Sequence, residues 1–157
     1  MRNIARPLKL GNGNEVYLAS GKYGDLQRAI IEKFVPQFIA DATMLYLGNI
    51  ANKSLVCEQK KLEQMLIPIT THHMLADIIL FQEVKNCLYL ITIGISYGFI
   101  SQERHHEIEA LLEKCTAKRV YVSVFPNMAE YKRYVSHIAW GSHVWIAEIP
   151  EHTIYHE

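Results

Sequence analysis

The sequence predicts an α/β domain in which helices cover both faces of a mixed β-sheet. Helix-like and strand-like segments alternate along the chain, and two of the strand-like segments are separated by so short a turn that they should pair as an antiparallel hairpin. Half of the 157 residues are apolar or aromatic, which allows a chain of this length to bury a substantial core. We expect one domain over residues 21–157, preceded by an N-terminal arm at residues 1–20.

The first helix is expected over Asp25–Phe38, where apolar residues recur at every fourth position. Pro36 should end or kink this helix, because proline lacks a backbone donor and its ring collides with the preceding turn. The arm before the helix is interrupted by Pro7, Gly11 and Gly13, which favours an extended segment or a hairpin.

The middle of the chain combines strands with a second helix. A strand is expected over Thr43–Leu47. Ser54 can cap a helix that runs to about Leu66, because a serine hydroxyl accepts a hydrogen bond from a free N–H of the first turn. The hairpin follows, with strands over Leu75–Phe81 and Cys87–Ile95.

A third helix should begin after Ser101, which can cap it in the same way. The inner face of this helix is expected to carry Ile108, Leu111, Leu112 and Cys115. The largely apolar stretch Arg119–Phe125 then predicts a strand deep in the sheet.

A fourth helix is indicated by Asn127 and Glu130, which have the spacing of a capping box. One face of this helix should carry Tyr131, Tyr134, Val135 and Ile138. The final strand is expected over His143–Ile149, with Pro150 ending it.

The charges of the chain cancel. Its 16 lysines and arginines are matched by 16 aspartates and glutamates, whereas proteins that bind nucleic acid through phosphates usually carry a basic excess. The balance lowers the expectation of strong non-specific DNA binding without excluding a local basic patch.

The cysteines and the apolar runs bear on location. The widely spaced Cys57, Cys87 and Cys115 are typical of buried free thiols in a reducing compartment. No segment resembles a signal peptide, and the longest apolar run, Leu88–Ile95, is far shorter than the roughly 20 residues that span a bilayer. We expect a cytoplasmic protein that does not enter a membrane.

Several short motifs, taken together and in order, resemble those of BsuBI/PstI-type restriction endonucleases. They lie between about residue 18 and the C-terminus. The main ones are residues 45–53, Ala76-Asp77-Ile78-Ile79-Leu80, Ser96-Tyr97-Gly98-Phe99-Ile100-Ser101, Val122-Ser123-Val124-Phe125-Pro126 and Ile138-Ala139-Trp140.

The resemblance implies the PD-(D/E)xK nuclease fold, a DNA substrate and Mg²⁺ as cofactor if the chain is active. In this fold an Asp and a Glu or Asp on adjacent hairpin strands converge on Mg²⁺, which activates water against a phosphodiester. Asp77 matches the first carboxylate, but the second should fall at Thr92, which carries no charge. The chain also departs from the family at Asn49, where an Asp is usual, and at Gly141, where a Glu is usual.

Two kinds of site residue follow from the resemblance. Asp77 would hold the metal, with Glu83 or Glu32 supplying a second carboxylate. Lys53, Ser96 and Ser101 are the candidates that would face DNA. Each residue also has a structural interpretation: Asp77 can bond to a nearby backbone N–H, Glu83 and Lys53 can simply be solvated, and Ser101 can serve as a helix cap.

Three functions remain open at this point. The first is a restriction endonuclease-like protein with a degenerate site that still binds DNA. The second is an active Mg²⁺-dependent endonuclease with rearranged ligands. The third is a non-catalytic interaction module that uses aromatic residues such as Tyr131, Tyr134 and Trp145. By analogy with enzymes that cut both DNA strands, a homodimer is expected.

Overall fold

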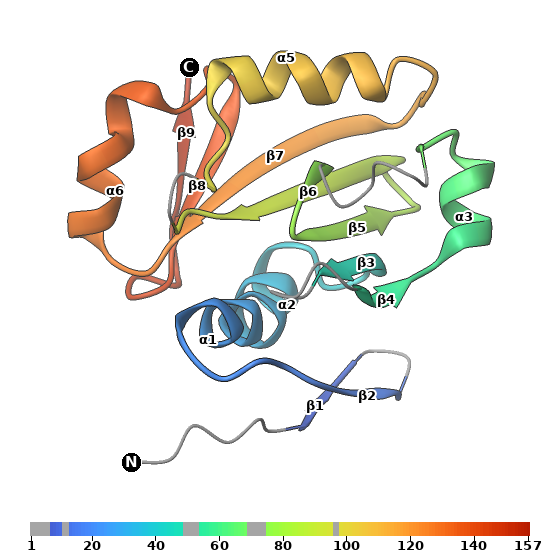
Figure 1. Cartoon of the computed structure of the whole chain (residues 1–157), viewed down its shortest axis with the longest axis horizontal. Helices are drawn as coiled ribbons and strands as arrows, with labels where there is room; N and C mark the ends of the chain where they lie inside the picture. Colours follow the sequence, from blue (N-terminus) through green and yellow to red (C-terminus); the bar gives the residue numbers. More distant parts are fainter. Residues whose placement is uncertain (1–6, 11–12, 49–53, 69–74, 96–97) are drawn as a thin grey trace.

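The fold is built on a seven-stranded mixed sheet (Figure 1). The structure, a computed structural model, describes residues 7–10, 13–48, 54–68, 75–95 and 98–157. The strand order is β4-β3-β5-β6-β7-β8-β9, and β1 and β2 form a separate hairpin. The strands are β1 (Pro7–Lys9), β2 (Glu15–Tyr17), β3 (Thr43–Gly48), β4 (Ser54–Cys57), β5 (Ile78–Gln82), β6 (Cys87–Ile93), β7 (Lys118–Phe125), β8 (Ser142–Ile146) and β9 (Thr153–His156).

The helices fill the intervals between the strands. They are α1 (Lys22–Ala29), the π-helical turn η1 (Ile30–Phe34), α2 (Val35–Phe38), α3 (Gln59–Gln64), α5 (Gln102–Leu111), α6 (Met128–Tyr134) and the 3₁₀ turn η3 (Val135–His137). None of the helices in the described ranges is long and apolar enough to cross a membrane. The α/β class predicted from the alternating pattern is confirmed.

The sheet is parallel at its centre and antiparallel towards both edges. β6 pairs in parallel with β7, and β7 with β8, while β5 and β6 form the predicted antiparallel hairpin, in which Ile78 is opposite Ile91. A parallel pair needs a crossover connection, and α5 supplies it between β6 and β7.

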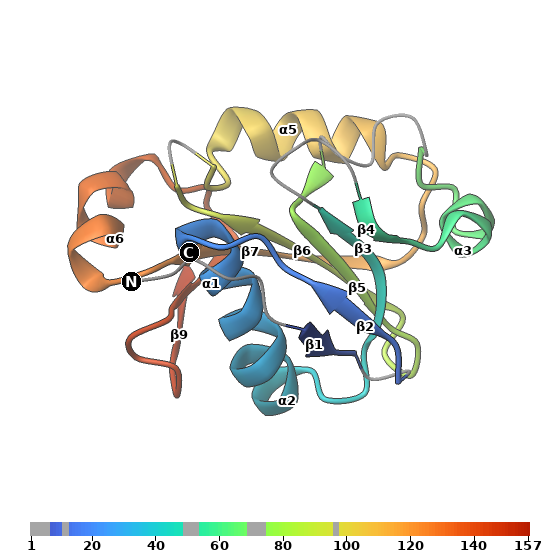
Figure 2. The same ribbon diagram turned by 60° about the horizontal axis from the view of Figure 1, so that its bottom comes forward.

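Two hydrophobic layers cover the sheet, one on each face, because successive side chains of a strand point to opposite sides. Ile79 and Leu90 pack with α5 and α3 on one face, and Ile78 and Ile91 pack with α1, η1 and the β1–β2 hairpin on the other. Figures 1 and 2 show α5 on one side of the sheet and α1, α2 and the hairpin on the other. Helices therefore cover both faces, as predicted.

The first helical run extends from Lys22 to Phe38, but it is not a continuous α-helix. A π-helical turn, Ile30–Phe34, interrupts it just before Pro36. Pro36 has no N–H to donate, and its ring would collide with the carbonyl of Glu32 in a regular α-helix, so a wider turn relieves the conflict. The predicted kink is therefore confirmed as a π turn, while the helix itself continues beyond the proline.

The helix predicted from Ser54 is wrong in its first half. Residues Ser54–Cys57 form β4, which pairs with β3 at the edge of the sheet, and the helix starts only at Gln59. Leu55 packs in the layer under α1, whereas Leu62 lies in the layer under α5. The two leucines thus lie on opposite faces of the sheet and cannot share one helical stripe.

The C-terminal end also differs from the prediction. α6 ends at Tyr134, and Ile138 is buried beyond the 3₁₀ turn that follows it, so the predicted helix is too long. β8 ends at Ile146, and an additional strand, β9, pairs with it in antiparallel orientation. The short, partly exposed alternation of β9 was not strong enough to predict a strand.

Candidate functional site

Asp77 stands immediately before β5 and is tied to three other elements. Its backbone N–H donates to the carbonyl of Ile91 at 2.9 Å, and its own carbonyl accepts from the N–H of Gly48 at 2.8 Å. Its carboxylate accepts from the N–H of Ile93 at Oδ2 and from the hydroxyl of Tyr23 at Oδ1, both at 2.7 Å. The bond to Ile93 is the structural interpretation given above, so both oxygens of this carboxylate already serve the fold.

Burial dominates the electrostatics of this carboxyl. It raises the pKa of Asp77, and the bonds from Ile93 and Tyr23 together with the charge of Arg104 only partly oppose that rise. Burial and the neighbouring Asp77 charge also raise the pKa of Tyr23. Asp77 thus lies in a buried environment that disfavours its negative charge.

Thr92, the residue at which the resemblance predicts a second carboxylate, lies on β6. Its side chain is 0% exposed, and its Oγ1 has no hydrogen-bond partner among the described residues. Across the β6–β7 pairing it lies beside Ser123, whose Oγ accepts from the N–H of Ile100 at 2.9 Å. Thr92 thus brings no charge of its own to the place beside Asp77, whose carboxylate accepts from the N–H of the next residue, Ile93.

In the PD-(D/E)xK pattern that the resemblance implies, a lysine usually follows the second carboxylate by two residues, and two residues after Thr92 this chain has Gly94. A Cβ at this position would lie 2.6 and 2.8 Å from two ring carbons of Phe125 and 3.0 Å from the carbonyl oxygen of Val124. Real Cβ atoms do not come so close to other atoms, so a lysine at position 94 requires the Phe125 ring to move. The ring of Phe125 therefore occupies the space that a side chain at position 94 would need.

The structure does not bring the candidate second carboxylates to Asp77. Glu83 is exposed in the turn after β5, so the length of that strand, roughly 20 Å, separates it from Asp77. Glu32 is exposed in η1 and forms an ion pair with Arg28 at 3.2 Å.

The predicted DNA-facing residues have different outcomes. Ser101 caps α5, because its Oγ accepts from the N–H of Arg104 at 3.2 Å. Lys53, Ser96 and Asn49 lie outside the described residues. The hydroxyl of Ser101 is therefore used by the helix, and the structure does not address the others.

The aromatic residues considered for an interface are mainly core. Trp145 is 0% exposed, and its ring meets Phe34 edge-on. Tyr131 and Tyr134 are half-buried against Phe125.

Three residues near Asp77 were not anticipated from the sequence. Tyr23 and Gln27 lie one turn apart on α1, and Gln27 donates from Nε2 to the carbonyl of Gly48 at 2.9 Å. Arg104 is in the first turn of α5, and its charge acts on Asp77. The signal available for Gln27 was a polar residue inside an apolar helical stripe.

These residues do not fit a Mg²⁺ ion, which prefers several hard oxygen ligands. Asp77 supplies one carboxylate, whose oxygens already accept hydrogen bonds, and Thr92 supplies none. Across the described ranges no group of three or more His, Cys, Asp or Glu residues is arranged to hold a metal. The arrangement can bind and orient polar groups, but it lacks the charge to concentrate a divalent cation.

Comparisons with known proteins agree on one family. A sequence profile of the BsuBI/PstI restriction endonuclease domain matches residues 6–157. The chain is similar to the type II restriction enzyme BsuBI of Bacillus subtilis (32% identity over 149 residues, 95% of this chain and 47% of the relative) and to the type II restriction enzyme AplI of Arthrospira platensis (26% over 155 residues, 94% and 48%).

A solved structure supports the same grouping. The structure of SdaI restriction endonuclease superposes with a TM-score of 0.89 at 27% identity, covering 98% of this chain and 48% of that one. The chain spans about half the length of the relatives it matches.

Proposed function

The chain belongs to the BsuBI/PstI restriction endonuclease family, and from that premise we propose that it retains the nuclease fold and a capacity to bind DNA but lacks an efficient metal-dependent cleavage site. The observation that carries the proposal is Thr92, a neutral and fully buried residue where the resemblance predicts the second metal-binding carboxylate. Gly94 supports it, since Phe125 fills the space next to it.

The missing charge has a large expected effect on metal affinity. At an effective dielectric constant near 20, one ion pair at contact distance is worth several kcal/mol. A divalent ion at Asp77 would lose at least that much when a carboxylate is replaced by a threonine. We therefore expect Mg²⁺ affinity to be lower by orders of magnitude than at a site with two carboxylates.

Plasmid cleavage tests the proposal directly. Wild-type protein and Asp77→Ala are incubated with supercoiled DNA in Mg²⁺ or Mn²⁺, and neither should cut above background. Cleavage by the wild type that disappears in Asp77→Ala would instead establish an active endonuclease with rearranged ligands, and it would overturn the proposal.

A restored charge provides the matched gain-of-function test. Thr92→Glu places a second carboxylate beside Asp77, so it should lower the melting temperature in EDTA, because the new charge is buried, and Mg²⁺ or Mn²⁺ should return much of the loss. The double variant Thr92→Glu/Asp77→Asn is the control and should not respond to metal. An equal metal response in both variants would place the metal elsewhere.

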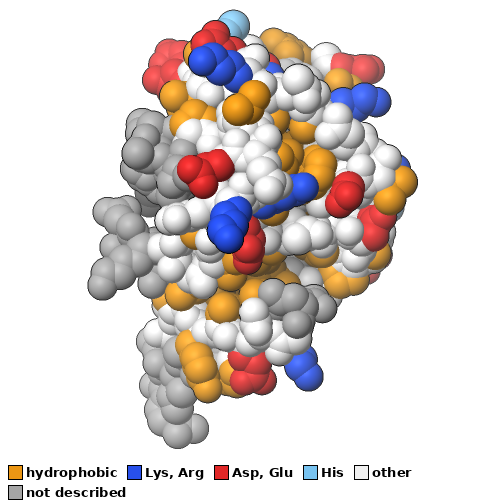
Figure 3. Space-filling model, turned by 90° about the vertical axis from the view of Figure 1, so that its right-hand side faces the viewer, with side chains coloured by type: hydrophobic (Ala, Val, Ile, Leu, Met, Phe, Trp, Pro, Cys, Tyr) orange, Lys and Arg blue, Asp and Glu red, His pale blue; other side chains and the backbone are white. Residues whose placement is uncertain are grey.

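We propose DNA as the partner because the chain belongs to this family. We propose a homodimer by analogy with enzymes that cut both DNA strands. On the face shown in Figure 3, Lys and Arg side chains are interspersed with Asp and Glu among hydrophobic and other side chains. Such a surface favours salt-sensitive, weak phosphate contacts over a continuous basic track. Retardation of duplex DNA at low salt, together with sedimentation across a concentration range, tests both points.

A further inference from the structure

A groove beside the start of α5 is not used by the site around Asp77. Its volume is about 740 Å³, and its floor is formed by the buried residues Phe99 and Ile138. Its rim carries the exposed polar residues Gln102, Glu103, His106 and His137. We call this feature the α5 groove.

Trp140 stands at the rim of the α5 groove with 67% of its surface exposed. An indole of this size is usually at least half covered in a folded protein, so its exposure beside a hollow is unusual. The other tryptophan, Trp145, is fully buried. The exposed ring is not needed by the core and is free to meet a ligand.

The backbone around Trp140 is held firmly. The N–H of Ala139 donates to the carbonyl of Ile100 at 2.9 Å, and the N–H of Trp140 donates to Oε1 of Gln102 at 3.3 Å. Figures 1 and 2 show the start of α5 beside the segment that follows α6. The groove is thus formed by two segments that are distant in sequence, and it should exist before any ligand arrives.

The chemistry of the rim selects a class of ligand. A flat aromatic face, flanked by imidazole and amide groups, suits a planar heterocycle that can stack and also form hydrogen bonds at its edges. The carboxylate of Glu103 repels a phosphate, so the heterocycle rather than the phosphate should enter. Because the chain has no net charge, stacking is also a mode of nucleic-acid binding that does not require a basic surface.

The groove is also close to the candidate site. Gln102 and Glu103 are in the first turn of α5, and Arg104, the next residue, acts electrostatically on Asp77. A strand with a base in the groove would therefore pass near Asp77.

We propose that the α5 groove binds an unpaired nucleobase of a DNA strand, stacked on Trp140. The inference rests on the proposed function, because it takes DNA as the ligand of this chain, and it adds the location and the mode of contact.

The test compares a single-stranded oligodeoxythymidylate of about 12 nucleotides with an abasic strand of the same length, which keeps the phosphates and removes the bases. Binding is followed by anisotropy of a labelled strand and by quenching of Trp140 emission. The base-containing strand should bind at least about fivefold more tightly, since stacking of one base is typically worth about 1 to 3 kcal/mol. This preference should persist at raised salt, because it does not depend on phosphate charge.

Variants locate the contact. Trp140→Ala should abolish the preference for bases, and Trp140→Phe should keep part of it. Tyr155→Ala removes another aromatic ring, one that is 52% exposed on β9, and should leave binding unchanged. Because all three changes are at exposed positions, folding is expected to survive them.

The outcomes separate this inference from the proposed function. Equal binding of both strands, with no effect of Trp140→Ala, would overturn the groove while leaving DNA binding in place. Failure to bind any DNA would overturn both the groove and the DNA-binding part of the proposal, while the cleavage tests would still stand. Self-association that is lost in Trp140→Ala would assign the groove to a second copy of the chain.

Discussion

Two polar clusters lie under the same helix, α5, and differ in how completely their groups are paired. Near the end of α5, Glu109 accepts from Nε and Nη2 of Arg119 at 2.9 and 3.1 Å, and it also accepts from the hydroxyl of Tyr121. Near the start of α5, Asp77 is held by two donors, but Thr92 has a buried hydroxyl without a partner among the described residues. The cluster around Glu109 is therefore well hydrogen-bonded and should stabilise the fold, whereas the cluster around Asp77 includes a buried polar group with no hydrogen bond in the described part of the chain.

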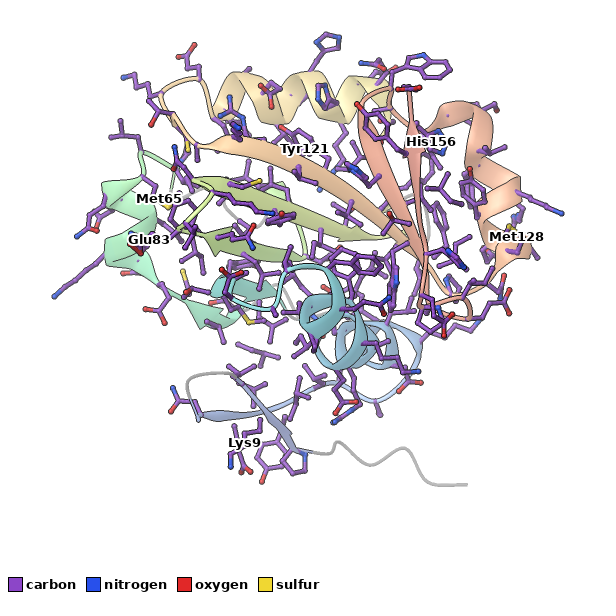
Figure 4. The ribbon with its side chains drawn as sticks, turned by 180° about the vertical axis from the view of Figure 1, so that it is seen from behind. Lys9, Met65, Glu83, Tyr121, Met128 and His156 are labelled. Atoms are coloured by element: carbon purple, nitrogen blue, oxygen red, sulfur yellow. The ribbon has the colours of Figure 1, made fainter. Side chains whose placement is uncertain are left out.

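The two clusters differ because the groups around Glu109 are linked to several partners each. Arg119 also donates from Nη1 to the carbonyls of Cys115 and Ala117, so it closes the end of α5 onto the start of β7. Figure 4 shows Tyr121 on β7 beneath α5. Removal of Glu109 takes an acceptor from both Arg119 and Tyr121, whereas removal of the Thr92 hydroxyl leaves no other group of the described chain unpaired.

The largest effect is therefore expected at Glu109. Glu109→Ala removes the acceptor of both Arg119 and the buried hydroxyl of Tyr121, so it should lower the free energy of unfolding by about 2 kcal/mol. Urea denaturation measures the change. Glu130→Ala breaks an exposed pair with Arg133 and serves as control, with an expected cost below about 0.5 kcal/mol. Similar small losses in both variants would show that the Glu109 cluster is not a stabilising unit.

Asp77→Asn should have the opposite sign and raise stability by about 1 kcal/mol at neutral pH, the size of a typical gain at a functional position. Burial raises the pKa of Asp77, so the folded state disfavours its charge. The cost of that charge is full above the folded pKa, decreases as the pH falls through that pKa, and is gone below the unfolded pKa. The advantage of Asn should therefore shrink on acidification, which thermal melts between neutral and acidic pH would detect. A destabilised Asp77→Asn would mean that the carboxylate charge itself holds Tyr23 and Ile93.

Thr92→Val keeps the shape and removes the unpaired hydroxyl, so stability should stay equal or rise by a few tenths of a kcal/mol. Ser123→Ala, the matched change on the neighbouring strand, removes the acceptor of the Ile100 N–H and should cost about 1 kcal/mol. Denaturation curves of both variants give the comparison. A loss in Thr92→Val as large as that in Ser123→Ala would reveal a partner for the hydroxyl.

The smallest effect is expected at the β8–β9 edge, where burial lowers the pKa of His143 and its Nδ1 has no hydrogen-bond partner in the described chain. A depressed histidine pKa means that the unfolded state takes up the proton first, so stability is lost as the pH falls below the usual value near 6.5. His143→Phe keeps a ring against Tyr155 and should flatten the pH dependence between neutral pH and about 5. An unchanged slope in this variant would assign the acid response to other groups.

Much of the frame could be predicted from the sequence, because buried strands and helix caps depend on local patterns. The β5–β6 hairpin, the caps at Ser101 and Asn127 and the irregularity near Pro36 are confirmed. Strand β4 was assigned to a helix because the face on which Leu55 packs depends on its pairing with β3. The apolar pattern of residues 54–57 alone does not show that this segment pairs with β3.

The candidate site was less accessible to sequence reasoning. Asp77 and Thr92 could be located by resemblance, but the contacts of Tyr23, Gln27 and Arg104 arise from elements far apart in the chain. The position of Glu83 illustrates the limit, since its closeness to Asp77 in sequence hides the length of a strand between them. Two residues that are near in sequence can be too far apart along an extended strand to bind the same metal ion.

The π turn at Ile30–Phe34 sets the rotational phase between the two ends of the first helical run. Each residue of an α-helix turns the next side chain by about 100°, so a wider turn shifts everything after it by roughly that amount. Before the turn, Tyr23 reaches Asp77, and at the last residue of the turn Phe34 reaches Trp145. A single-residue deletion within the turn would put these two contacts out of step, so the length of this short segment couples the polar end of the sheet to its aromatic core.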